Sequence, residues 1–149
     1  MSFVANGTAP QSNVSIASSS FFPTIGLDDI RHDVRIDGAV PVERVKQVLL
    51  EEIIDVNRLL SSIVVEGQTL ADLAVGTIDG KPETEILYFS AISSGVAAKI
   101  AERYRSYDST NSGNKRADEM TENIHEYRRN KVWAIQQLKG ENHTVVELI

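Results

Sequence analysis

The sequence predicts an all-α fold: a small bundle of three main antiparallel helices, with short extra helical turns, a flexible N-terminal arm and an extended C-terminal tail. Three observations predict it. Apolar residues recur at intervals of three and four in three long segments, as in amphipathic helices. Proline stands where two of these segments begin, a position that suits the first turn of a helix. The connections are short, so consecutive helices are expected to lie side by side in opposite directions.

Residues 1–20 are expected to form the flexible arm, because they are rich in Ser and Asn, low in charge and without an apolar period. The alternative is that this arm becomes ordered on a neighbouring subunit. The helical domain is expected over residues 21–140. It begins at Phe21 and Phe22, whose adjacent rings suit a hydrophobic groove, and continues with a short helix at about residues 28–35.

The first long helix is expected from Val42, directly after Pro41. Its apolar stripe runs to Ile63 and is widened by further apolar side chains, so more than one surface is expected to cover it. A connector over residues 67–82 follows, with one helical turn at residues 69–73.

The second long helix is expected to open at Pro82. A face of small residues runs along it, with Gly95 at its middle. Glycine inside a helix costs about 1 kcal/mol relative to alanine, so Gly95 predicts the close approach of another backbone. The inward seam beside this face is predicted to consist of Ile86, Phe89, Ser93, Val96, Ile100 and Tyr104.

The third long helix is expected over residues 115–139, after a break rich in Asp, Ser, Thr, Asn and Gly, with Gly140 as its stop. Residues 141–149 are expected to form the extended tail, which needs a partner chain because so short a segment forms no sheet alone. The inward seam of the helix is predicted to be Ala117, Met120, Ile124, Tyr127, Ala134 and Leu138, with Ile135 alongside. The binding side chains of the tail are predicted to be Val145, Val146, Leu148 and Ile149.

The composition excludes several classes of function. The chain of 149 residues has no cysteine, which excludes disulfides, thiolate metal sites and cysteine nucleophiles. The net charge is -6 and no basic stripe is visible, so sequence-specific nucleic-acid binding is not expected. Neither a membrane-spanning segment nor a secretory signal is expected.

Candidate catalytic or metal-binding residues are few. Glu122 and His125 have the spacing of a metal-binding pair, but only one such pair occurs, and it points away from the apolar seam. The acids at residues 51–52 and 83–85 are interpreted as helix surface, because nothing indicates the buried cleft that acid–base catalysis needs. The sequence therefore predicts no enzyme, no cofactor and no metal site.

Trp133 is predicted to lie on the polar face of the third helix, next to Arg129. It is expected to be covered either by another part of the chain, such as the Phe21–Phe22 segment, or by a neighbouring subunit, since Trp and Arg are enriched at interfaces. The candidate subunit interface consists of Phe21, Phe22, Arg103, Arg105, Arg129 and Trp133.

Several features share an order and spacing that identify a family. They are Phe21-Phe22-Pro23 after a Ser-rich arm, the helix end at residues 102–105 running into Asp108-Ser109, then Gly113-x-Lys115, Trp133 and the short tail to Ile149. Taken together, they resemble the head completion protein family of P2-like tailed phages.

The resemblance implies a structural head–tail connector subunit that is not an enzyme. Such a subunit binds the portal after DNA packaging, extends the DNA channel and offers a platform to the tail or a tail-terminator protein. The implied assembly is a ring of about twelve copies on the portal, built by head-to-tail contacts. The implied location is the virion, after synthesis in the host cytoplasm.

Within that assembly, the tail is predicted to add as a strand to the portal or to an adjacent subunit. The loops at residues 67–82 and 108–114 are the candidates for closing the channel, and the first is favoured as longer and more apolar. The alternative function is a small helical adaptor or regulatory module that binds a partner helix at the small-residue face of the second helix.

Overall fold

The computed structural model describes residues 14–34, 40–105 and 111–141, and the side chains of residues 14–34, 40–103 and 123–141. These parts of the chain are mostly helical. They contain the α-helices α1 (Leu27–Val34), α2 (Val42–Leu59), α3 (Glu83–Arg105) and α4 (Asn111–Leu138) and the 3-10 helices η1 (Ser61–Ile63) and η2 (Leu70–Leu73). They also contain two short antiparallel strand pairs, β1 (Ser15–Ile16) with β2 (Ile25–Gly26) and β3 (Thr77–Ile78) with β4 (Lys81–Pro82).

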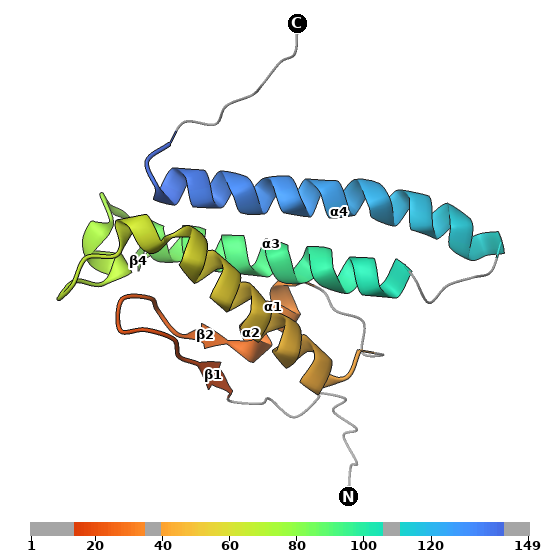
Figure 1. Ribbon diagram of the computed structural model, residues 1–149, viewed down its shortest axis with the longest axis horizontal. Coiled ribbons are helices and arrows are strands. Elements are labelled where there is room, and N and C mark those ends of the chain that lie inside the picture. The colour runs from red at the N-terminus through yellow and green to blue at the C-terminus, as the bar shows by residue number, and fades with distance from the viewer. Residues whose placement is uncertain (1–13, 35–39, 106–110, 142–149) are drawn as a thin grey trace, which may run out of the picture.

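The helices are arranged around α3. Helices α3 and α4 lie side by side in opposite directions, and α2 crosses α3 obliquely (Figure 1). The short α1 packs against α2 and α3. In the described parts of the chain, no helix combines the length and the apolar content needed to cross a membrane.

The N-terminal segment differs from the expectation of a flexible arm through residue 20. From Val14 onward it forms a hairpin, in which Ile16 pairs with Ile25 and the Leu27 amide donates to the Val14 carbonyl at 2.9 Å. The hairpin is fixed because the apolar residues that follow it are buried, and because the Asn57 amide donates to the Ser18 hydroxyl at 3.0 Å. Residues 1–13 lie outside the described part of the chain.

The apolar stripe predicted on α2 is confirmed. The helix begins at Val42, as Pro41 indicates, and the periodic residues turn inward. The predicted members that are buried are Val45, Leu49, Ile53, Val56 and Leu60.

The predicted seam of α3 is confirmed at Ser93 and Val96, which are buried, and is wrong nearer its two ends; the Tyr104 side chain lies outside the described ones. Ile86, Phe89 and Ile100 are only partly buried, while Tyr88 and Ile92 are completely buried. Because α1, α2 and α4 all contact α3, a broad face of this helix is covered, and that face includes Tyr88 and Ile92.

Helix α4 begins at Asn111, four residues before the predicted start. Its predicted seam is confirmed at Ile124, Ala134 and Ile135, which are buried, while Tyr127 and Leu138 are only partly buried. Gly140 ends the helix as expected: its φ is 71°, and the Glu141 amide donates to the Gln136 carbonyl at 2.8 Å.

Candidate assembly surfaces and a buried ionic network

One charged side chain lies inside the helical core. Glu52 of α2 is only 2% exposed. It stands three residues after Leu49 and four before Val56, on the apolar stripe of its helix. A carboxylate at such a position needs charged partners, because an isolated buried charge is very costly.

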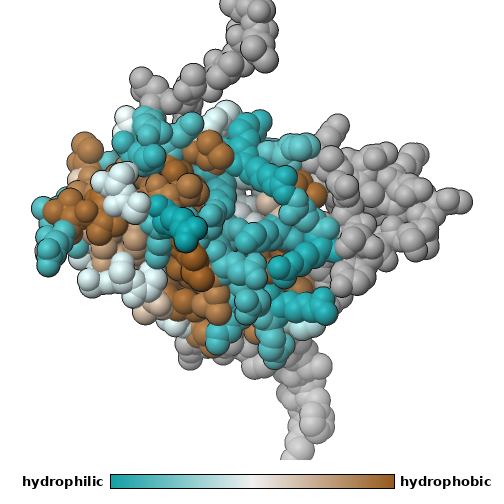
Figure 2. Space-filling model, viewed as in Figure 1, coloured by the Kyte–Doolittle hydropathy of each residue, from teal (hydrophilic) through white to brown (hydrophobic). Residues whose placement is uncertain are grey.

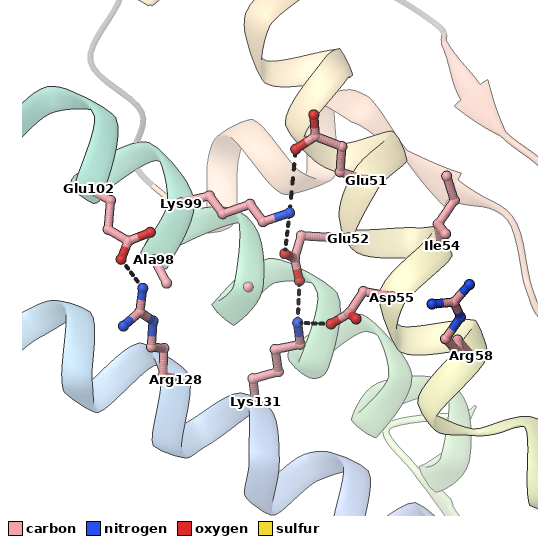
Figure 3. Close-up of a pocket in the computed structure, with 11 residues that line it drawn as sticks. Glu51, Glu52, Ile54, Asp55, Arg58, Ala98, Lys99, Glu102, Arg128 and Lys131 are labelled. Carbon is pink, nitrogen blue, oxygen red and sulfur yellow. Dashed lines mark hydrogen bonds and ion pairs between the residues drawn. The ribbon is translucent and has the colours of Figure 1, made fainter.

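Two lysines from the other long helices supply these partners. Lys131 of α4 lies 2.7 Å from one Glu52 oxygen, and Lys99 of α3 lies 3.1 Å from the other. Lys131 also lies 2.6 Å from Asp55, and Lys99 lies 3.3 Å from Glu51. The network therefore joins α2, α3 and α4 at one place (Figure 3).

Gly95 makes room for this carboxylate. A β-carbon built on Gly95 of α3 would overlap the Glu52 side chain. The close approach predicted at Gly95 is thus made by a carboxylate side chain of α2, and no backbone is needed to explain the glycine.

The charges of the network support one another. Burial of the ammonium acts to lower the pKa of Lys131, but the hydrogen bonds that it donates to Asp55 and Glu52, together with the attraction of these two carboxylates, raise the pKa. The pKa of Glu51 is lowered by the hydrogen bond that it accepts from Gln47 and by Lys99. Both groups therefore keep their charges at neutral pH.

The interpretation of residues 51–52 as helix surface is wrong for Glu52. The missed signal is periodic: Glu52 follows the apolar stripe of α2, and Lys131 stands seven residues from both Ile124 and Leu138 on the stripe of α4. A single acid and a single base at inward positions of two helices indicate a buried pair.

The network opens onto a groove of about 490 Å³ that is also lined by Ile54, Arg58 and Ala98. Its carboxylates are matched by ammonium groups, and among described side chains no buried polar atom lacks a hydrogen-bond partner. The described residues also contain no cluster of three or more His, Asp or Glu side chains placed to hold a metal ion. The arrangement is suited to holding the three helices together.

The predicted interface residues Phe21 and Phe22 lie inside the chain. They are 4% and 7% exposed, and their rings meet edge to face at 5.0 Å. Phe22 also stacks on Tyr88 at 5.1 Å. Since the chain itself covers both rings, they do not form part of its exposed surface.

Trp133 and Arg129 are brought together on α4. The guanidinium of Arg129 lies 4.6 Å from the centre of the Trp133 ring, which is a cation–π geometry. Trp133 is partly buried, and Val132 beside it is 50% exposed. These three residues form what we call the α4 surface.

Arg103 of the predicted interface lies elsewhere, on α3. It is exposed and pairs with Glu51 of α2 at 3.4 Å, so it extends the ionic network. The Arg105 side chain and the tail residues Val145, Val146, Leu148 and Ile149 lie outside the described side chains. The pair formed by Glu102 and Arg128 adds a further link between α3 and α4.

Comparison with known proteins identifies the family. Residues 16–149 match the family described as phage head completion protein (GPL). The chain is 27% identical over 139 residues to the head completion/stabilization protein of Escherichia phage P2, which covers 90% of this chain and 82% of that protein. No solved structure matches the chain significantly. The resemblance drawn from the sequence is confirmed, and the chain belongs to the phage head completion protein (GPL) family.

Proposed function

We propose that this structural head completion protein acts as a connector subunit, which binds the portal after DNA packaging, extends the DNA channel and provides the attachment platform for the tail. The observation that carries the proposal is the family match over residues 16–149. A ring of about twelve copies, closed by head-to-tail contacts, would give such a platform.

The ionic network supports a role in which the subunit must keep its shape. Glu52, Lys99 and Lys131 tie three helices to one point of the core. Breaking a buried ion pair by removing one partner costs about 3–5 kcal/mol, so the relative positions of the helices are strongly specified. A rigid subunit presents the same contact surfaces to each neighbour in an assembly.

The acidic balance also supports the proposal. With a net charge of -6, the protein as a whole repels the DNA phosphates. A channel built from such subunits lets DNA slide, whereas a basic lining would hold it. The loop that we propose to close the channel is the connector between α2 and α3, at residues 67–82.

The adaptor alternative finds less support. It requires an apolar groove along the small-residue face of α3, but the groove at Ala98 is lined mostly by charged side chains of the ionic network, and Ala91 and Ala97 are buried within the chain. A partner helix would have to displace elements that already pack there.

Imaging with portal rings tests the connector function. We expect purified full-length chain, mixed with portal rings of the same phage, to add a second ring of density on one face of the portal in negative-stain class averages. Portal rings that stay unchanged over the whole range of protein concentrations would contradict the proposal.

The tail gives a second test. We propose that residues 145–149 add as a strand to the portal or to an adjacent subunit, because their β-branched side chains suit extended structure. Deleting them is expected to remove the protein from DNA-filled heads. Glu147→Gln is the matched control, since it keeps every main-chain donor. Heads that retain full occupancy after the deletion would exclude this role.

A further inference from the structure

A groove lies between α1 and the first turns of α3. Its volume is about 460 Å³, and its lining comes from β2 and the two residues before it, from α1, from β4 and from α3. It adjoins the end of the molecule where α2 stops and α3 begins, and Figure 2 shows exposed apolar side chains at that end. We call it the α1–α3 groove.

One side of the α1–α3 groove is apolar. Ile86 and Phe89 stand three residues apart on α3, so they share one face of the helix, and Pro23 lies beside them in the lining. All three side chains are only partly buried. The sequence predicts Ile86 and Phe89 to face the core, and in the structure both line the groove instead. Because removing apolar surface from water is favourable, this side of the groove favours a covering segment with apolar side chains.

The charges of the α1–α3 groove restrict what can cover it. Three carboxylates line it, those of Asp29, Asp33 and Glu85, against one lysine, Lys81, and one histidine, His32. Like charges placed opposite each other are unfavourable, so a covering segment that carries acids is disfavoured. The tail at residues 141–149, which contains two glutamates, is therefore a poor occupant. A segment without acids and with hydrogen-bond donors for the carboxylates is a better one.

The arm at residues 1–13 has this character. It contains no charged side chain, and Phe3 and Val4 stand together as a pair of bulky apolar residues. Ser2, Asn6 and Thr8 surround this pair with hydroxyl and amide donors. The pair matches the apolar side of the α1–α3 groove, and the donors match its carboxylates.

The arm is attached next to the α1–α3 groove. It joins the described chain at Val14, whose carbonyl accepts a hydrogen bond from the Leu27 amide at the start of α1. The strand that follows, β1, pairs with β2, whose Ile25 lines the groove. An extended chain advances about 3.3 Å per residue, so Phe3 can lie up to about 35 Å from Val14. The eight residues of α1 span only about 12 Å. The arm therefore reaches the whole groove, and its covalent link gives it a local concentration that a separate chain lacks.

We infer that the arm occupies the α1–α3 groove of its own chain, with Phe3 packed against Ile86 and Phe89. An arm bound in this way keeps the apolar side of the groove out of contact with other copies. The inference concerns the single subunit and does not depend on the proposed connector ring. The family match begins at residue 16, so it does not include the arm.

Thiol labelling tests the inference, because the natural chain has no cysteine. The rate at which full-length Ile86→Cys reacts with a maleimide is measured with the natural arm and with Phe3→Asp. We expect Phe3→Asp to raise the rate roughly tenfold, since a carboxylate is repelled by an apolar and acidic groove. Ser12→Asp is the matched control, because it adds the same charge to the arm and keeps Phe3. An Ile54→Cys reporter, 65% exposed and outside the groove, should react equally fast with every arm.

Three results would overturn the inference. Equal rates with the natural arm and with Phe3→Asp would show that the arm does not cover the groove. Protection that disappears on dilution would assign the groove to the arm of a second copy. A faster reaction only after deletion of residues 145–149 would assign it to the tail. Thr24→Cys, at the exposed edge of the groove, is a second reporter that leaves its apolar side intact.

Discussion

The ammonium of Lys131 on α4 lies 2.7 Å from the buried carboxylate of Glu52 on α2. These residues are 79 positions apart in the sequence. Their contact links α4 to α2 across α3, and it makes each residue depend on the other.

Replacing Lys131 with methionine is expected to destabilise the protein by about 3–5 kcal/mol, because Glu52 then stays buried with one partner fewer. Urea unfolding measured by circular dichroism checks this value. Lys139→Met is the control: its pair with Glu141 is partly exposed, and a loss below about 1 kcal/mol is expected. Adding Glu52→Met to Lys131→Met is expected to recover most of the lost stability. No recovery would show that the network has more than an electrostatic role.

The Gly95→Ala substitution is expected to destabilise the chain by about 1–3 kcal/mol, because the new methyl group overlaps the Glu52 side chain. In a Glu52→Ala background the sign is expected to reverse, with a gain of about 1 kcal/mol from helix propensity. Unfolding curves of the natural chain, the two single variants and the double variant measure the coupling between Gly95 and Glu52. Gly76→Ala, where a β-carbon meets nothing within 4 Å, should change stability by less than about 1 kcal/mol. Equal losses of stability from Gly95→Ala in both backgrounds would show that Gly95 is not needed to make room for Glu52.

Trp133→Ala is expected to weaken ring formation by roughly tenfold or more, since Trp at an interface is often a hot spot. The helical circular dichroism signal and the melting temperature of the monomer should change little, because Trp133 is only partly buried. Sedimentation with portal rings measures the first effect, and thermal melting measures the second. A large loss of monomer stability with normal assembly would assign Trp133 to the core.

Tyr88 gives a prediction at high pH. Burial raises the pKa of its phenol to about 12, although hydrogen bonds with Ser18 and Asn57 act in the opposite direction. The unfolded chain releases this proton near its ordinary pKa of 10.0, and the folded chain holds it to about 12. The free energy of unfolding is therefore expected to fall as pH rises from about 10 to about 12.

The Tyr88→Phe variant isolates that effect. It removes the hydrogen bond of 2.7 Å to Asn57, so a constant loss of about 0.5–1.5 kcal/mol is expected below pH 9. The difference in unfolding free energy between the natural chain and the variant should shrink or change sign above pH 10. A difference that stays constant over this range would show that Tyr88 titrates normally.

Local signals in the sequence predicted the helices well. Pro41, Pro82 and Gly140 mark helix ends in the structure because each acts through its own backbone. The stripe of α2 was also predictable, since one period controls it. The resemblance identified the family, because several short features kept their order along the chain.

Features that depend on two helices were harder to predict. Glu52, Gly95 and Lys131 acquire meaning only when three helices are known to meet at one point. The central position of Tyr88 in the core likewise depends on Phe22, which reaches α3 from a different segment. Periodicity within one helix cannot give these pairings, because it contains no information about which faces meet.

The space that Gly95 leaves for Glu52 also limits how α2 can move. Sliding α2 by one helical turn, about 5.4 Å, would move the Glu52 carboxylate away from the space that Gly95 leaves and bring an apolar side chain such as Val48 or Val56 toward Gly95. Lys131 would then lose its contact with Glu52. The fit of Glu52 against Gly95 therefore sets the register of α2 along α3.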